Sequence, residues 1–192
     1  FSLDGTPCDC VIVALDGGLA HWTPDIQPAL CVSGVNQGPN LSVDVMHSGT
    51  VSAAREAGLY GMPALASSLA TYEHADFEQS GAATVEIIEA CPAVLPTLPL
   101  NLLRPNGSRN VPEGEDEREL IISSFAHGNL ILNINGPQNW TNGYQTVTLG
   151  ARWYHNAIDM SDAEHIGVVY EVGAVQIEDE DIAGTDCNAI KE

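Results

Sequence analysis

The sequence predicts an α/β fold whose sheet is at least partly parallel. Short apolar runs rich in β-forming residues alternate along the chain with longer segments that carry helix caps, and loops containing Gly and Pro separate them. This alternation is typical of βα units, in which helices cover the faces of one sheet. Such sheets bind ligands at the carboxyl ends of their strands, so we expect a site in the loops that follow the strands.

The first predicted element is a helix that begins at Thr6-Pro7. Thr6 can cap the helix, Pro7 suits its first turn, and Asp9 completes a capping box. Residues 10–15 are apolar and rich in β-formers, so a buried strand competes with a helix in that stretch. The cap favours the helix, which we expect to end at Gly17-Gly18.

The middle of the chain predicts strands and helices in alternation. The strands are short apolar runs bounded by Pro or Gly, and the helices carry small or apolar residues at helical spacing. In chain order, the predicted elements are a strand at 29–33, a loop at 34–42, a helix at 50–58, a strand at 63–67, a helix at 76–91 and a strand at 129–135. Residues 144–149 predict a further strand, and residues 167–177 are also β-rich.

A Pro-rich and acidic stretch at 92–119 interrupts this alternation. It holds five prolines and the run Glu113-Gly114-Glu115-Asp116-Glu117, so it predicts a long surface connection rather than a domain boundary. At 192 residues the chain has the length of one domain, and its 44 % hydrophobic content is enough for a core. We therefore expect residues 1–192 to form a single domain.

The composition excludes some classes of partner. The formal net charge is −20, from 26 acidic and six basic residues, and such a surface repels the backbone of duplex DNA or RNA. No run of about 18 apolar residues predicts a membrane span, and no signal peptide is recognisable. Five scattered cysteines suggest free thiols in a reducing compartment, so we expect a cytoplasmic protein. The acidity fits either a salt-adapted cytoplasm or an ordinary acidic protein.

Two segments could carry chemistry. The first, at 33–40, has glycines that let the backbone approach a ligand, and Asn36 and Asn40, whose amides can donate to phosphate or offer an oxygen to a hard cation. It could equally be a surface turn. The second, at 47–50, opens a predicted helix with free N–H groups and hydroxyls, which suits an anion, although Ser48 or Thr50 could be an ordinary cap. The two segments lie ten residues apart, and together they favour a phosphate site.

Several motifs resemble those of the SurE family, the stationary-phase survival type of 5′/3′-nucleotidases. The three longest matches lie at 5–11, 33–41 and 48–54, and supporting matches lie at 61–66, 132–137 and 184–186. They follow the family's order and cover nearly the whole chain. The resemblance implies a Rossmann-like, three-layer α/β/α fold with a mostly parallel sheet.

The resemblance also implies a function and its residues. It implies a hydrolase that needs a divalent cation, Mg²⁺ or Mn²⁺, and releases phosphate from nucleoside 5′- and 3′-monophosphates. By the family's pattern, Asn36 is a metal ligand and Asn40 is a catalytic residue beside the phosphate and the attacking water. Ser48, Gly49 and Thr50 bind the phosphate together with Asn40. Family members assemble as homodimers or homotetramers.

One departure from the family's pattern leaves alternatives open. The family holds its metal partly with an adjacent pair of aspartates, and no segment of this sequence matches that pair. We expect the chain to belong to a longer protein and to be incomplete at both ends. The alternatives are an inactive relative that binds nucleotide or phosphate without turnover, and an acidic scaffold that binds neither.

Overall fold

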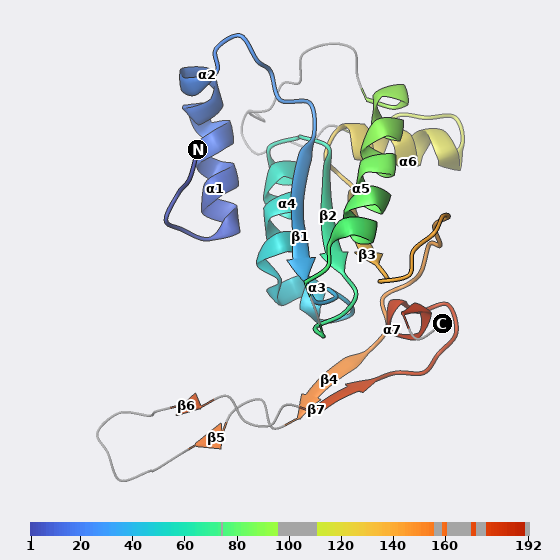
Figure 1. Ribbon diagram of the computed structural model, residues 1–192. Helices are drawn as coiled ribbons and strands as arrows, with labels where there is room; N and C mark the ends of the chain where they lie inside the picture. Colours follow the sequence, from blue (N-terminus) through green and yellow to red (C-terminus); the bar gives the residue numbers. More distant parts are fainter. Residues whose placement is uncertain (74, 96–110, 156–158, 161–169, 172–175, 191–192) are drawn as a thin grey trace. The chain divides into compact units, whose positions relative to one another are not determined.

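The computed structural model describes residues 1–73, 75–95, 111–155, 159–160, 170–171 and 176–190 (Figure 1). The chain divides into two compact units. One comprises residues 1–40 and 44–143, and the other comprises residues 41–43 and 144–192.

The first unit contains a three-stranded parallel sheet in the order β1-β2-β3 (Figure 1). Its strands are β1 (Cys31–Gln37), β2 (Ala64–Leu69) and β3 (Ile131–Gly136). All six residues of the central strand β2 are buried, whereas Val32 of β1 remains 43 % exposed. The predicted α/β fold with a parallel sheet is therefore confirmed, and so are the three strands expected at 29–33, 63–67 and 129–135.

Two long helices cover opposite faces of this sheet. Buried residues of α4 (Gly49–Leu59) pack against Ala64 and Ala66 of β2, whereas Thr84 of α5 (Glu78–Ala90) shares a 2.6 Å hydrogen bond with Ser67. Successive residues of a strand point to opposite faces, so the two helices lie on different sides and the unit has three layers. The helical segments of this unit are α1 (Pro7–Val13), a π-helical segment (Ala14–Gly18), α2 (Leu19–Trp22), α3 (Asp44–His47), α4 (Gly49–Leu59), α5 (Glu78–Ala90), a 3₁₀ turn (Cys91–Ala93) and α6 (Glu117–Ala126).

The first helix begins as predicted but does not end as predicted. Asp9 accepts the Thr6 N–H at 2.7 Å and Thr6 accepts the Asp9 N–H at 3.3 Å, which completes the capping box. The helical path continues past Gly17-Gly18 to Trp22. Gly17 has φ of 108° and only kinks the path, because Gly18 returns to helical dihedrals.

Three other boundaries differ from the sequence prediction. β1 runs on to Gln37, so the predicted loop at 34–42 begins four residues late. The short helix α3 lies in the segment before α4 and has no predicted counterpart. The predicted surface connection at 92–119 overlaps α6, because Asp116 of the acidic run caps this helix by accepting the Glu119 N–H at 2.9 Å. Most of that connection, residues 96–110, lies outside the described residues.

The second unit is built around antiparallel strand pairs. β4 (Arg152–His155) pairs with β7 (Gln176–Asp179), β5 (Asp159–Met160) pairs with β6 (Tyr170–Glu171), and α7 spans Asp186–Ala189. The strand predicted at 144–149 is wrong: these residues form only an isolated bridge, between Thr148 and Thr185. The β-rich stretch at 167–177 includes β6 and the start of β7, and its other residues lie outside the described part. Within the described residues, no helix is both long and apolar enough to cross a bilayer.

Candidate active site

A row of polar side chains crosses the carboxyl ends of the three parallel strands. Asn36 of β1 pairs in register with Ser68 of β2, and Ser68 pairs with Asn135 of β3. Residues in register on parallel strands point to the same face, and Ser68 shares its face with Ala66, which packs against α4. The row therefore lies on the α4 face of the sheet, at the edge where parallel α/β sheets bind ligands.

A bulge in β1 brings Asn36 into this row. Two residues separate Ser33 from Asn36 on β1, whereas only one separates their partners Ala66 and Ser68 on β2. The extra residue shifts the strand by one position, so that Asn36 and not Val35 meets Ser68. Gly34 makes the bulge possible: its φ is 122°, and a Cβ there would overlap the Ser67 carbonyl oxygen.

Asn40 is held in place by hydrogen bonds from three directions. Its side-chain amide donates to the Ser68 hydroxyl at 2.6 Å, and its backbone N–H donates to the Asn135 side-chain oxygen at 2.8 Å. Its carbonyl accepts from the amides of Asn133 and Asn135, at 2.9 and 3.1 Å. The residue is 5 % exposed. The predicted catalytic residue thus lies in a buried turn that is hydrogen-bonded to the ends of β2 and β3.

One polar atom of the Asn36 side chain makes no hydrogen bond to a described residue. Its amide nitrogen donates to the carbonyls of Gln37 and Gly38, at 3.2 and 2.8 Å. Its Oδ1 accepts no hydrogen bond from any described residue. Because both contacts fix the nitrogen side of the amide, the oxygen is oriented and available.

The start of α4 offers unused hydrogen-bond donors. Ser48 is the N-cap and accepts the Val51 N–H at 3.1 Å, so the cap is Ser48 and not Thr50. Within the described part of the chain, the N–H groups of Gly49 and Thr50 and the Thr50 hydroxyl have no acceptor. Donors of this kind at a helix start suit an anion. Gly49 also has a packing role, because a Cβ there would lie 3.0 Å from Pro7 of α1.

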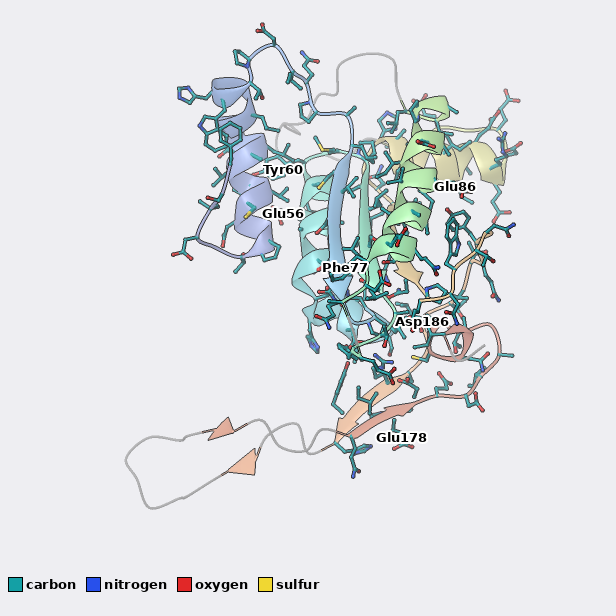
Figure 2. The ribbon with its side chains drawn as sticks, viewed as in Figure 1. Glu56, Tyr60, Phe77, Glu86, Glu178 and Asp186 are labelled. Carbon is teal, nitrogen blue, oxygen red and sulfur yellow. The ribbon has the colours of Figure 1, made fainter. Side chains whose placement is uncertain are left out.

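The two predicted segments lie at the same edge of the sheet. Figure 1 shows α3 and the first turn of α4 at the arrowhead end of β1. Asn36 is the second-last residue of β1, and Asn40 follows the end of this strand by three residues. Figure 2 draws the side chains around these strand ends, with Phe77 marking the residue before α5. That Asn36, Asn40 and residues 48–50 act on one phosphoryl group stays a prediction.

Sequence reasoning missed the two asparagines of β3. Asn133 and Asn135 were recognised only as part of a supporting motif, but both bind the Asn40 backbone. The Oδ1 of Asn133 is buried and has no hydrogen-bond partner among the described residues. A buried oxygen in this state is a place for ordered water or a ligand. The available signal was the spacing Asn-x-Asn, which puts both side chains on one face of a strand.

The described residues fit a divalent cation through one amide oxygen. Hard cations prefer oxygen ligands, and the Oδ1 of Asn36 is such an oxygen, oriented and without a donor. No group of three or more His, Cys, Asp or Glu that could hold a metal occurs among the residues described. Asn36 could therefore be one ligand of a cation.

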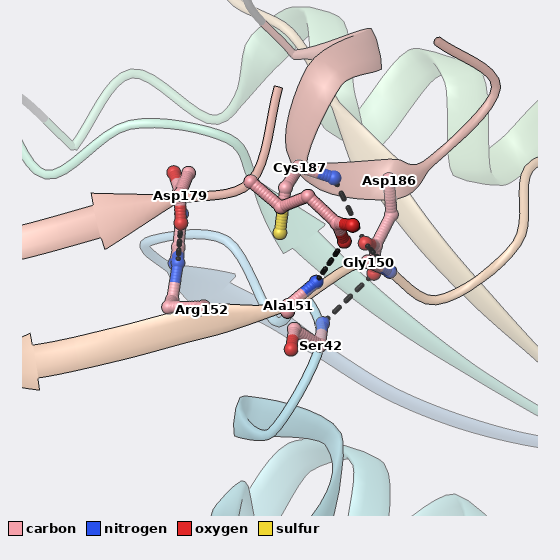
Figure 3. Close-up of polar contacts among 8 residues, drawn as sticks. Ser42, Gly150, Ala151, Arg152, Asp179, Asp186 and Cys187 are labelled. Atoms are coloured by element: carbon pink, nitrogen blue, oxygen red, sulfur yellow. Dashed lines mark hydrogen bonds and ion pairs between the residues drawn. The ribbon is translucent and has the colours of Figure 1, made fainter. Parts of the chain in front are cut away.

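In the second unit, the Asp186 carboxylate accepts hydrogen bonds from three backbone N–H groups (Figure 3). Its carboxylate accepts from Gly150 at 2.7 Å and from Ser42 and Cys187 at 2.8 Å. Ser42 has a φ of 50°, which is unusual for a residue other than glycine. The clamp thus fixes the short segment that follows Asn40 in the chain. Sequence matching included Asp186 but assigned it no role, because its partner Ser42 is 144 residues away.

Two neighbouring groups support this cluster (Figure 3). Arg152 is buried and forms a two-point ion pair with Asp179, at 2.6 and 2.8 Å, across β4 and β7. Burial and the nearby Asp186 carboxylate raise the pKa of the Cys187 thiol to about 12. Cys187 is therefore a packed, protonated thiol and not a nucleophile.

The sequence is similar to curated proteins that are named 5′-nucleotidase SurE. It is 35 % identical over 193 residues to the 5′-nucleotidase SurE of Pelotomaculum thermopropionicum, a match that covers 100 % of this chain and 61 % of that protein. It is 31 % identical to the 5′-nucleotidase SurE of Myxococcus xanthus, over 99 % of this chain and 60 % of that protein. The chain thus spans about 60 % of the length of these relatives.

A solved structure and a family model agree with these matches. The crystal structure of the SurE protein from Aquifex aeolicus superposes with a TM-score of 0.59 at 27 % identity, covering 98 % of this chain and 63 % of that one. The family model described as survival protein SurE matches residues 1–156. The resemblance seen in the motifs is confirmed, and the chain belongs to the SurE family.

Proposed function

We propose that the protein is a metal-dependent phosphatase that hydrolyses nucleoside 5′- and 3′-monophosphates to nucleoside and phosphate. One observation carries the proposal: an oriented amide oxygen on Asn36, a fixed Asn40 turn and the unused donors at the start of α4 lie at one edge of the sheet. The relatives named 5′-nucleotidase SurE support the choice of nucleotide as substrate.

Charge explains why such a site needs a cation. A phosphate monoester is doubly negative at neutral pH, and the chain carries a formal net charge of −20. A bound divalent cation, Mg²⁺ or Mn²⁺, would supply neutralisation of the phosphate and activation of water. Asn36 would be one of its ligands.

The other residues of the site position the substrate. The N–H groups of Gly49 and Thr50 and the hydroxyls of Ser48 and Thr50 would donate to phosphate oxygens. The Asn40 turn, whose shape is fixed by Ser68, Asn133 and Asn135, would hold its amide beside the phosphorus and the attacking water. Because these donors are placed before substrate arrives, they stabilise charge that develops on the transferring group without reorganisation.

Assembly and compartment follow from family membership and composition. We expect a homodimer or homotetramer in the cytoplasm, with no duplex nucleic acid and no membrane as partner. Sedimentation of the purified protein tests the assembly.

Phosphate release tests the function. The protein expressed from its complete gene should release phosphate from AMP or GMP with Mn²⁺ or Mg²⁺, and EDTA should stop the reaction. AMP binding by calorimetry without turnover in either metal would identify an inactive nucleotide-binding relative. No AMP-dependent change in melting temperature, with or without metal, would leave the acidic scaffold as the remaining alternative.

A further inference from the structure

An exposed tyrosine lies on the turn that joins Asn36 to Asn40. Gly38 has a φ of 98°, and a Cβ on it would overlap the Cε1 atom of Tyr72 and lie 2.6 Å from two more atoms of that ring. The ring therefore lies against the Cα of Gly38. Tyr72 is nevertheless 56 % exposed. A large part of this aromatic side chain faces solvent while the backbone of the turn supports it.

The turn beneath Tyr72 is the one that carries the two asparagines. The Gly38 carbonyl accepts the Asn36 amide at 2.8 Å, and Asn40 follows two residues later. Tyr72 itself follows β2 by three residues, so it also comes from the carboxyl edge of the sheet. The ring is thus tied to the same short segment as the metal and phosphate residues.

The phosphate end of the site cannot by itself select a nucleotide. Asn36, Asn40 and the start of α4 offer amides, hydroxyls and backbone N–H groups, which suit any phosphate monoester. A nucleobase differs from other leaving groups by its flat π face, which proteins recognise by stacking an aromatic ring on it. In a nucleoside monophosphate only the sugar separates base from phosphate, so a stacking ring must lie close to the phosphate residues.

We propose that Tyr72 stacks on the nucleobase of the substrate and makes the site prefer nucleotides to phosphates that lack a base. This inference rests on the proposed function and names the part of the site that recognises the leaving nucleoside. Because every base has a π face, such stacking accepts purines and pyrimidines alike. The support from Gly38 keeps the ring in place before the substrate binds, which lowers the entropy cost of stacking.

The test compares a nucleotide with a base-free substrate. With Mn²⁺, kcat and KM are measured for AMP and for ribose 5-phosphate on the complete protein and on Tyr72→Leu, Tyr72→Phe and Phe77→Leu. We expect Tyr72→Leu to lower the ratio of kcat/KM for AMP to that for ribose 5-phosphate about tenfold, through KM. Tyr72→Phe keeps the ring and should keep the ratio. Phe77 is an aromatic residue 37 % exposed just before α5, and Phe77→Leu should leave the ratio unchanged.

The outcomes separate this inference from the proposed function. An equal loss on both substrates in Tyr72→Leu, or an unchanged ratio, overturns stacking while the phosphatase stands. If the ratio of kcat/KM values falls in Phe77→Leu and not in Tyr72→Leu, Phe77 is the ring that contacts the base, and the inference about Tyr72 is overturned. If the unmodified protein hydrolyses neither substrate, the proposed function fails, and calorimetry with AMP then tests the stacking inference. Weaker AMP binding by Tyr72→Leu than by Tyr72→Phe supports stacking. Equal binding by the two variants, or no binding, overturns it. Should Tyr72→Leu not fold, Tyr72→Gln replaces it.

Discussion

Asn36 and Asn40 belong to one short segment but differ in which of their polar groups are hydrogen-bonded and in the partners of those bonds. Asn40 is buried, and its side chain and both of its backbone polar groups are engaged by residues of β2 and β3. Asn36 engages only its amide nitrogen, and only with carbonyls of its own segment. The two amides therefore differ in what fixes them: neighbouring strands hold the Asn40 side chain, whereas the Asn36 side chain is held by its own segment and its oxygen accepts no hydrogen bond from a described residue.

The largest expected effect comes from Asn36. Asn36→Ala removes the oriented oxygen, and we expect phosphate release from AMP to fall at least about a hundredfold. The melting temperature should change little, because the lost hydrogen bonds are local. Gln37→Ala, the exposed neighbouring amide, is the matched control and should keep its activity. Full activity in Asn36→Ala would remove this residue from the metal site.

Asn40→Ala should damage both activity and stability. Loss of one preorganised donor costs on the order of a hundredfold in kcat. The Ser68 hydroxyl would also lose its buried partner, at a cost of about 1–3 kcal/mol of unfolding free energy. Urea unfolding and AMP kinetics measure the two effects. If Asn40→Ala were as stable as Asn36→Ala, the contrast drawn between the two asparagines would be wrong.

Asp186→Asn tests a residue that should affect stability first. The substitution replaces a carboxylate that accepts three N–H groups with an amide that cannot accept them all. We expect a loss of about 2 kcal/mol in urea unfolding. Asp181→Asn is the control, because Asp181 is exposed and accepts from Asn188 at 3.0 Å. Equal stability of the two variants would show that the clamp around Ser42 contributes nothing.

A smaller effect is expected at the donors of α4 that we propose to bind phosphate. Thr50→Val removes a hydroxyl that binds no described residue, so the free energy of unfolding should not change. The KM for AMP should rise severalfold, which corresponds to roughly the net free energy of one hydrogen bond. Thr50→Ser keeps the hydroxyl and should restore KM. A change in stability without a change in KM would assign Thr50 to the fold and not to the site.

The smallest effect concerns Cys187, whose pKa is raised to about 12 from its ordinary value of 9.0. At about pH 8 the native protein should react with iodoacetamide at the exposed Cys10 and not at the buried Cys187, as mass spectrometry of the digested product would show. Between these two pKa values the unfolded thiol ionises and the folded one does not, so this group's contribution to stability is present below pH 9 and is lost as pH rises toward 12. Labelling of Cys187 in the native state would contradict the assignment.

Local chemistry made much of the fold predictable. The strands β1, β2 and β3 could be predicted because short apolar runs bounded by Pro and Gly are typical of buried strands. The start of α1 could be predicted because Thr6, Pro7 and Asp9 form a cap without contacts to distant residues. The helix at 50–58 was predicted within one residue at either end. These features depend on neighbours in the chain.

Features that depend on distant residues were not predictable. The Gly34–Gln37 part of β1 resembles a turn until its pairing with β2 is known, and the clamp on Ser42 needs Asp186 from the other end of the chain. The candidate site was predictable as a set of residues, through the motifs. The division of labour between Asn36 and Asn40 was not, because it depends on which hydrogen bonds each one has already made.

The bulge at Gly34 has a consequence for how relatives of this chain are interpreted. A relative could keep both asparagines, the Ser-Gly-Thr segment and every other letter of the motifs, yet carry a larger residue at the position of Gly34. Such a residue would meet the backbone of the adjacent strand, and a straightened first strand would turn the first asparagine toward the opposite helix layer. Its sequence would still match the family, but the amide oxygen that we propose as a cation ligand would be on the wrong side of the sheet.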